Sequence, residues 1–406
     1  MAKPKFSRAA IWVLVAGSLI LAISTGMRHG FGIFLQPMSL DHSWGREVFS
    51  FAIAIQNIVW GLAQPFAGML ADRYGAGKTI VVGALLYCAG LALMAISHTG
   101  LAFSLSAGVL VGLGLAGTTF SVVFGAVGRV AAPEHRAVAL GIAGAVASIG
   151  QFILSPVSLA LIEGFSWPIA LFGLAILAAF MVPLAFPMME RAGSAGPPEM
   201  TAREALREAS RHSGFWLLSF GFFVCGFQVV FIGVHLPAFL VDQRLPNHVG
   251  TTALALVGLF NVVGSFVSGM VANRIPKPYL LSLMYGGRGV FVALFIFTPI
   301  TATSAYIFAI AMGLVWLATV PLTNGVVATI FGVRNLSMLG GIVFMFHQIG
   351  AFLGGWLGGL VFDATGSYDT VWFIVIGLSV LATMLNLPIK EVPIPSLTRA
   401  KARAQA

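Results

Sequence analysis

Charged residues are scarce in this sequence. Only 9% of its 406 residues are Asp, Glu, Lys or Arg, whereas 58% are hydrophobic. A soluble domain carries roughly 25% charged residues, because its surface must face water. The composition therefore excludes an ordinary soluble domain and predicts an integral membrane protein.

Cysteine is scarce too. Cys88 and Cys225 are the 2 cysteines, and both lie in apolar stretches. They provide neither a disulfide framework nor a CxxC metal motif. The histidines lack the spacing of a zinc site, so we expect no metal and no other cofactor. The sequence also lacks a phosphate-binding loop and a catalytic pair, which disfavours an ATP-driven pump and an enzyme with catalytic residues.

Acidic residues are absent from the middle of every apolar run. The sequence has 13 Asp and Glu residues, and each falls in a loop, a tail or at the end of a run. A carrier of cations needs a carboxylate within the membrane. The sequence therefore disfavours cation export and leaves any buried arginine without an acid.

What the sequence does contain is a series of about twelve apolar runs, each long enough to cross a hydrocarbon core of roughly 30 Å. We expect helices, because lipid leaves unpaired backbone groups uncompensated and the runs lack the alternation of a β-barrel. The predicted fold is therefore an all-α membrane protein with transmembrane helices at about 11–38, 48–71, 78–97, 101–128, 136–160, 167–186, 213–241, 250–272, 279–298, 301–330, 335–361 and 369–388.

The cations orient these helices. Of the 22 Lys and Arg residues, 18 fall in the two tails and the even-numbered loops. The four exceptions are Arg28, Arg46, Arg244 and Arg288. The positive-inside rule then places both termini in the cytoplasm, in a bacterial-type inner membrane. This distribution accounts for the net charge of +9 without a nucleic-acid partner. We interpret the first run as a transmembrane helix and not as a cleaved signal, since eleven more follow.

The two halves of the sequence repeat each other. Pro37 matches Pro237 and Gly150 matches Gly350, each at an offset of 200 residues. We therefore predict six-helix halves at 1–189 and 213–406, related as parallel repeats. Between them, 190–212 is polar and contains a capping-box pattern from Thr201 to Glu204, which predicts a short amphipathic cytoplasmic helix.

The segment Gly68-Met-Leu-Ala-Asp72-Arg73-Tyr-Gly75-Ala-Gly-Lys78 resembles the loop signature of the major facilitator superfamily. Three looser motifs resemble its monocarboxylate porter branch: Phe31-Gly-Ile-Phe34, Trp44-Gly-Arg46-Glu-Val-Phe-Ser50 and Asp363-Ala-Thr-Gly-Ser-Tyr368. The resemblance implies that spans one, four, seven and ten line a central cavity. It also implies that Gly68, Asp72, Arg73 and Gly75 form a conformational latch, with Asp72 against the start of span eleven. Span eight carries Asn261 and Ser265-Phe266 where the branch has an acid and an Arg-Pro pair, so the resemblance does not fix the substrate.

Arg28 and Arg288 lie inside apolar runs. A buried arginine without an acid suits an anionic ligand, because its planar fork matches a carboxylate. Arg28 could instead bond backbone carbonyls, and Arg288 could be a strut between helices. The predicted substrate-binding residues are polar, basic or aromatic side chains within runs: Arg28, His29, Thr119, Gln228, Arg288, Trp316, Thr319 and Asn324.

Three histidines also lie within runs: His29, His235 and His347. Because histidine titrates near neutral pH, each is a candidate to carry a coupling proton, or else a hydrogen bond between helices. The main hypothesis is therefore a monomeric secondary transporter of small organic anions, monocarboxylates in the simplest case, with a possible proton co-substrate. The alternative is uptake of a larger aromatic or heterocyclic nutrient, such as an aromatic acid or a flavin-type vitamin. A membrane receptor is disfavoured because no polar segment is long enough for a signalling domain, and an intramembrane enzyme is disfavoured because the sequence lacks a catalytic pair.

Overall fold

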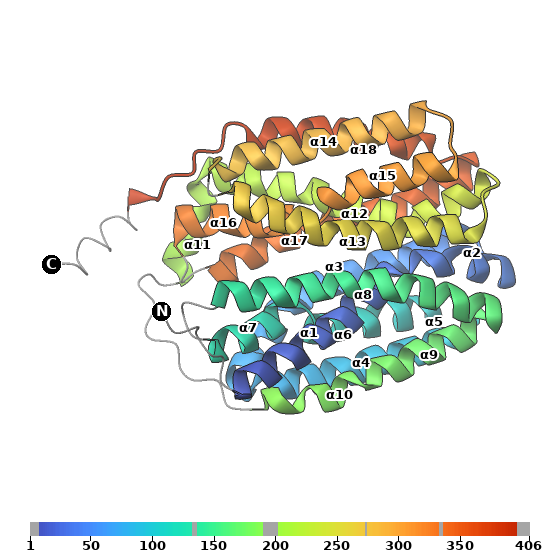
Figure 1. The fold of residues 1–406 in the computed structure, drawn as a ribbon, viewed down its shortest axis with the longest axis horizontal. Helices are drawn as coiled ribbons and strands as arrows, with labels where there is room; N and C mark the ends of the chain where they lie inside the picture. Colours follow the sequence, from blue (N-terminus) through green and yellow to red (C-terminus); the bar gives the residue numbers. More distant parts are fainter. Residues whose placement is uncertain (1–7, 132–135, 190–201, 273, 333–335, 396–406) are drawn as a thin grey trace.

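The computed structural model describes residues 8–131, 136–189, 202–272, 274–332 and 336–395, and within them it is helical without a strand (Figure 1). Twelve segments in this described part are long and apolar enough to cross a membrane. The structure thus confirms the all-α prediction and the number of spans.

The N-terminal half contains spans one to six. Its helices are α1 (Arg8–His29), α2 (Gly32–Asp41), α3 (Arg46–Tyr74), α4 (Ala76–Ala95), α5 (Gly100–Phe103), α6 (Val111–Thr118), α7 (Phe120–Val130), α8 (Arg136–Gly164), α9 (Trp167–Ala179) and α10 (Met181–Leu184). A π-helical stretch at Ser104–Leu110 joins α5 to α6, and a 3₁₀ turn at Phe186–Met188 follows α10.

The C-terminal half contains spans seven to twelve. Its helices are α12 (Ser213–Asp242), α13 (Asn247–Val271), α14 (Lys277–Phe297), α15 (Ala302–Leu314), α16 (Thr319–Phe331), α17 (Leu336–Thr365) and α18 (Asp369–Asn386). The short helix α11 (Ala202–Arg211) precedes them, with charged side chains on its exposed face and Ala205 and Ala209 buried beneath.

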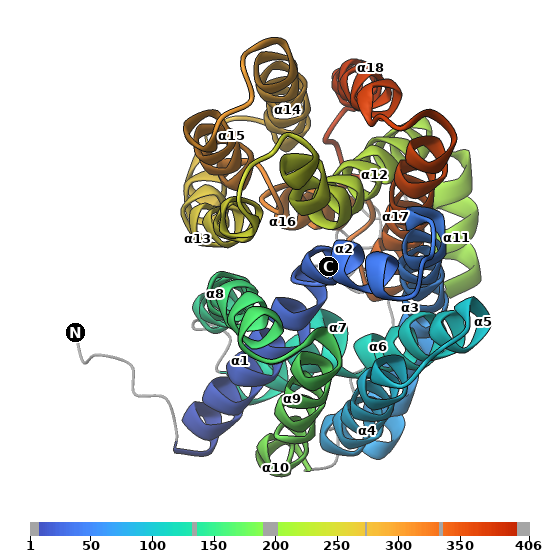
Figure 2. The ribbon, with the colours of Figure 1, turned by 90° about the vertical axis from the view of Figure 1, so that its right-hand side faces the viewer.

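The halves form two groups of helices that pack against each other (Figure 2). Across the interface α3 packs on α17, α8 on α13 and α2 on α12. We call the end of the bundle at which α1 begins the Arg8 end, and the opposite end, at which α3 begins, the Arg46 end; they lie at the left and right of Figure 1.

The repeat reappears as a repeated helix contact. A Cβ on Gly150 of α8 would meet the backbone of Ala22 in α1, and a Cβ on Gly350 of α17 would meet the backbone of Phe223 in α12. Close approach of this kind needs small residues, because membrane helices gain their stability from direct backbone packing. The same glycine therefore holds the same pair of spans in each half.

Three of the four spans that the family resemblance assigns to the cavity are interrupted, which the uninterrupted apolar runs did not predict. Span one breaks after His29, where α1 ends and a turn leads to α2. Span four breaks at Thr119, whose backbone is extended with φ −105° and ψ −169°. Span ten breaks between Leu314 and Thr319. Such breaks release backbone groups that lipid cannot satisfy, so they occur where protein or a cavity surrounds them.

Candidate functional site

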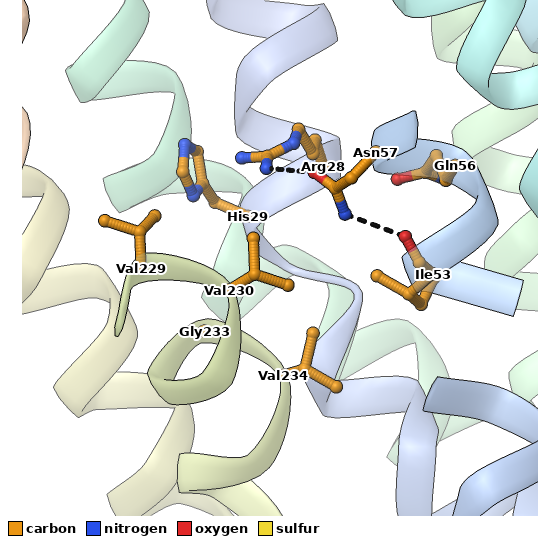
Figure 3. A pocket seen from close by; sticks show the side chains of 9 residues that line it. All are labelled: Arg28, His29, Ile53, Gln56, Asn57, Val229, Val230, Gly233 and Val234. Carbon is orange, nitrogen blue, oxygen red and sulfur yellow. Dashed lines mark hydrogen bonds between the residues drawn. The ribbon is translucent and has the colours of Figure 1, made fainter. Parts of the chain in front are cut away.

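A small pocket lies between α1, α3 and α12, near the break in span one (Figure 3). Its empty volume, including space open to solvent, is about 280 Å³. Its lining residues are Arg28, His29, Ile53, Gln56, Asn57, Val229, Val230, Gly233 and Val234.

Arg28 is the cation of the pocket. It lies in the last turn of α1, where the negative end of the helix dipole favours a positive charge. Its Nη2 donates to Asn57 Oδ1 at 2.7 Å, and its guanidinium carbon lies 4.8 Å from the ring centre of Trp60. Helix dipole, amide oxygen and aromatic face together stabilise the charge without an acid.

These contacts leave part of the guanidinium free. The Nε of Arg28 is buried and has no hydrogen-bond acceptor among the described residues. None of the nine residues that line the pocket is acidic. A buried N–H of a guanidinium without an acceptor can donate a charge-assisted hydrogen bond to a carboxylate. Arg28 is therefore the candidate anion site of this pocket.

Asn57 joins this site to the other half. Its Nδ2 donates to the carbonyl of Ile53 at 2.7 Å, which turns Oδ1 toward Arg28 (Figure 3). Its backbone oxygen accepts a hydrogen bond from Gln348 Nε2 of α17 at 3.0 Å. The residue that orients Arg28 is therefore also a contact between the halves.

Arg288 has a different environment. It is fully buried, and it donates to the backbone oxygens of Val315 and Trp316, where α15 ends in the break of span ten. Its Nη1 also reaches Gln228 Oε1 at 3.2 Å and Cys225 Sγ at 3.3 Å. Arg288 therefore caps the broken helix, and it is not one of the residues that line the pocket at Arg28.

The three candidate histidines have different surroundings. His29 lines the pocket beside Arg28. His347 has its Nδ1 3.0 Å from Gln348 Oε1 and stacks on Phe344. His235 is fully buried, with Nε2 2.8 Å from the carbonyl of Gly355 and Nδ1 3.2 Å from the Tyr368 hydroxyl. The two partners of His235 imply that Nε2 carries the proton and that Tyr368 donates to Nδ1.

The other predicted substrate residues lie outside this pocket, and their roles stay predictions. Thr119 accepts a hydrogen bond from Trp60 Nε1 at 3.1 Å. Gln228 donates to Ser379 Oγ at 2.6 Å in addition to holding Arg288. Thr319 lies 3.4 Å from Cys225 Sγ, Trp316 is fully buried, and Asn324 is exposed.

The structure describes three of the four residues of the predicted latch in full: Gly68, Arg73 and Gly75. Gly75 separates α3 from α4 with φ 97°, a left-handed conformation that favours glycine. A Cβ on Gly68 would meet no other atom within 4 Å, and Arg73 is exposed. The side chain of Asp72 lies outside what the structure describes.

The candidates named from the sequence did not include Gln56 and Asn57, which line the pocket, or Trp60, whose ring faces Arg28. All three lie in α3, which is span two, and the family resemblance does not assign that span to the cavity. A signal was present, because Gln56 and Asn57 are adjacent amides in the middle of an apolar run. Polar residues at such depth face a bundle interior or a wet cavity and mark functional sites.

This fold and its central site define a membrane transporter with two six-helix halves. The family model described as Major Facilitator Superfamily matches residues 14–334, so the chain belongs to that superfamily. A Bacillus subtilis (strain 168) protein named "Uncharacterized MFS-type transporter YcxA" is 26% identical over 413 residues, which cover 96% of this chain and 97% of the relative.

Two rat proteins are similar as well. "Monocarboxylate transporter 12" of Rattus norvegicus is 26% identical over 424 residues, which cover 93% of this chain and 84% of that protein. "Monocarboxylate transporter 13" of the same species is 26% identical over 401 residues, which cover 93% of this chain and 89% of that protein. The family and these relatives indicate a transport protein, not an enzyme.

Proposed function

We propose that this chain is a secondary transporter of small organic anions of the monocarboxylate type, which it moves by alternating access around Arg28. The observation that carries the proposal is the buried Nε of Arg28, which has no acceptor among the described residues and lies in a pocket whose lining contains no acid. The names of the rat relatives point in the same direction. The small volume of the pocket favours this substrate class over a flavin-sized nutrient.

The proposal includes an orientation and a coupling proton. The distribution of Lys and Arg supports an orientation with the Arg8 end in the cytoplasm, in a bacterial-type inner membrane. His29 lines the same pocket as Arg28, so an anion bound there would stabilise the protonated imidazole. One anion and one proton would then cross together, which is an electroneutral symport.

Uptake into proteoliposomes tests the function. The purified protein is supplied with radiolabelled monocarboxylates, aromatic acids and riboflavin, with and without a pH gradient. The proposal predicts saturable uptake of a monocarboxylate that increases when the outside is acidic and that is lost in Arg28→Gln. Uptake of riboflavin alone, or carboxylate uptake that does not depend on Arg28, would contradict it.

A further inference from the structure

The pocket at Arg28 contains a second buried polar atom without a partner. The Oε1 of Gln56, like the Nε of Arg28, makes no hydrogen bond to any described residue. Both residues line the same small pocket, and Gln56 is fully buried. Buried polar atoms without a partner are rare in folded proteins, and two in one pocket require an explanation.

A hydrogen bond from Nε2 fixes the orientation of the Gln56 amide. Nε2 donates to the backbone oxygen of Ala107 in the π-helical stretch at 2.8 Å. Because the amide is planar, Oε1 then faces away from Ala107. Figure 3 shows this oxygen on the side of Asn57. The contact with Ala107 therefore presents a hydrogen-bond acceptor to the pocket.

The neighbours in the pocket do not satisfy this acceptor. Asn57 donates to the carbonyl of Ile53 and accepts from Arg28. Opposite them, α12 contributes three valines and Gly233, which have no polar side-chain atoms. The pocket thus combines a free cationic donor with a free neutral acceptor, and a ligand that satisfies both needs an acceptor group and a donor group.

We propose that Gln56 is a specificity-determining residue that accepts a hydrogen bond from a hydroxyl or N–H group on the transported carboxylate. The inference rests on the proposed function, since Arg28 must hold the carboxylate. The small pocket places the donor close to the carboxylate, as on the adjacent carbon of a 2-hydroxy acid. A site built to bond a hydroxyl discriminates strongly against the analogue that lacks it, because its buried polar atom is then unpaired.

Matched ligands test this in the wild-type protein. Propanoate, 2-hydroxypropanoate and 2-oxopropanoate differ only at the carbon next to the carboxylate. Their dissociation constants are measured on purified protein by calorimetry and by inhibition of counterflow. The same three groups on phenylacetate test a larger skeleton. We expect the 2-hydroxy acid of a series to bind roughly ten- to a hundredfold more tightly than the other two.

A pair of variants assigns the preference to one amide. Gln56→Met keeps the length of the side chain and removes the acceptor, so we expect the three acids of a series to bind within about threefold of one another. Gln64→Met is the matched control. Gln64 is also a buried amide of α3, but its Oε1 already accepts from Trp60 Nε1 at 2.6 Å. We expect this control to keep the preference for the 2-hydroxy acid.

The outcomes separate this inference from the proposed function. Carboxylates that bind through Arg28 but show no preference in the wild type would overturn the role of Gln56 and leave the anion site intact. The same holds if the preference persists in Gln56→Met. If no carboxylate of either series binds, or if binding does not depend on Arg28, both proposals fail. Because the wild-type comparison needs no variant, a Gln56→Met protein that fails to insert does not prevent the test.

Discussion

Arg46 and Asp242 form a bidentate ion pair between the two halves: Nη1 and Nη2 of Arg46 each lie 2.6 Å from a carboxylate oxygen of Asp242. Arg46 begins α3 and Asp242 ends α12, so the pair closes the interface at the Arg46 end. Asp363 of α17 reinforces it by accepting from the backbone N–H groups of Arg46 and Glu47 at 2.9 and 2.7 Å. Alternating access requires these contacts to break, so they stabilise the conformation that the structure shows.

Asp242→Asn should favour opening at the Arg46 end, because it removes the charge that holds Arg46. A partly exposed pair contributes about 1 kcal/mol, so we expect about fivefold faster labelling of a cysteine at Gly233 from that side. A Cβ at Gly233 meets no other atom within 4 Å, so this reporter fits the pocket wall. The measurement uses a membrane-impermeant thiol reagent, with the native Cys88 and Cys225 replaced by Ser.

Asp369→Asn is the matched control for that experiment. Asp369 is an exposed acid at the same end of the bundle, where it begins α18. It should leave the labelling rate unchanged. Equal labelling rates in the Asp242 variant and the wild type would show that the ion pair does not hold the halves together.

Arg28→Gln should bind carboxylates about ten- to a hundredfold more weakly, since it removes a charged hydrogen bond to the ligand. The protein should be at least as stable as the wild type to heating, because Gln at this position leaves no buried charge to compensate. Arg28→Lys should also bind weakly, since an ammonium group cannot reproduce the planar fork. Calorimetry gives the affinity and a melting curve in detergent gives the stability. Near-normal affinity in Arg28→Gln would make Arg28 a structural residue.

Arg288→Ala should lower the stability of the protein and leave its affinity for carboxylates nearly unchanged, which is the opposite of the effect expected for Arg28→Gln. It leaves the carbonyl oxygens of Val315 and Trp316 without their donor, which should lower the free energy of unfolding by about 2–3 kcal/mol. The affinity of the surviving protein for carboxylates should stay within about threefold of the wild type, since Arg288 does not line the pocket at Arg28. The same melting curves and calorimetry apply. A stable variant that has lost ligand binding would show that Arg288 contacts the substrate.

His29→Gln should abolish accumulation driven by a pH gradient and preserve counterflow without one. The reason is that His29 is the histidine that lines the pocket beside the anion site. A bound anion favours the protonated form of a neighbouring imidazole, so His29 would take up a proton together with the substrate. His235→Gln is the control, because both ring nitrogens of His235 have protein partners. If pH-driven accumulation survives in His29→Gln and in His347→Gln, the proton travels on the substrate or is not coupled.

The apolar runs predicted the twelve helices, because a run without the alternation of a β-barrel can satisfy its backbone in lipid only as a helix. The repeated Pro and Gly positions predicted the two halves. Arg28 and His29 could also be named from the sequence, because they are basic residues inside an apolar run, and both line the pocket in the structure. The apolar runs did not reveal the breaks in spans one, four and ten. An apolar run looks the same whether its helix is continuous or interrupted, and the groups that satisfy a break come from distant segments.

What the sequence by itself determined is which residues are costly in a membrane: a few arginines, histidines and amides in apolar surroundings. Only the tertiary structure decided which partners each of them has, and the partners determine what a buried polar group is free to do. Arg288 meets the carbonyls of a broken helix and is satisfied by the protein. Arg28 meets one amide oxygen and an aromatic face, and its Nε remains free. Two arginines that are alike in the sequence thus differ in the one property that a ligand can use.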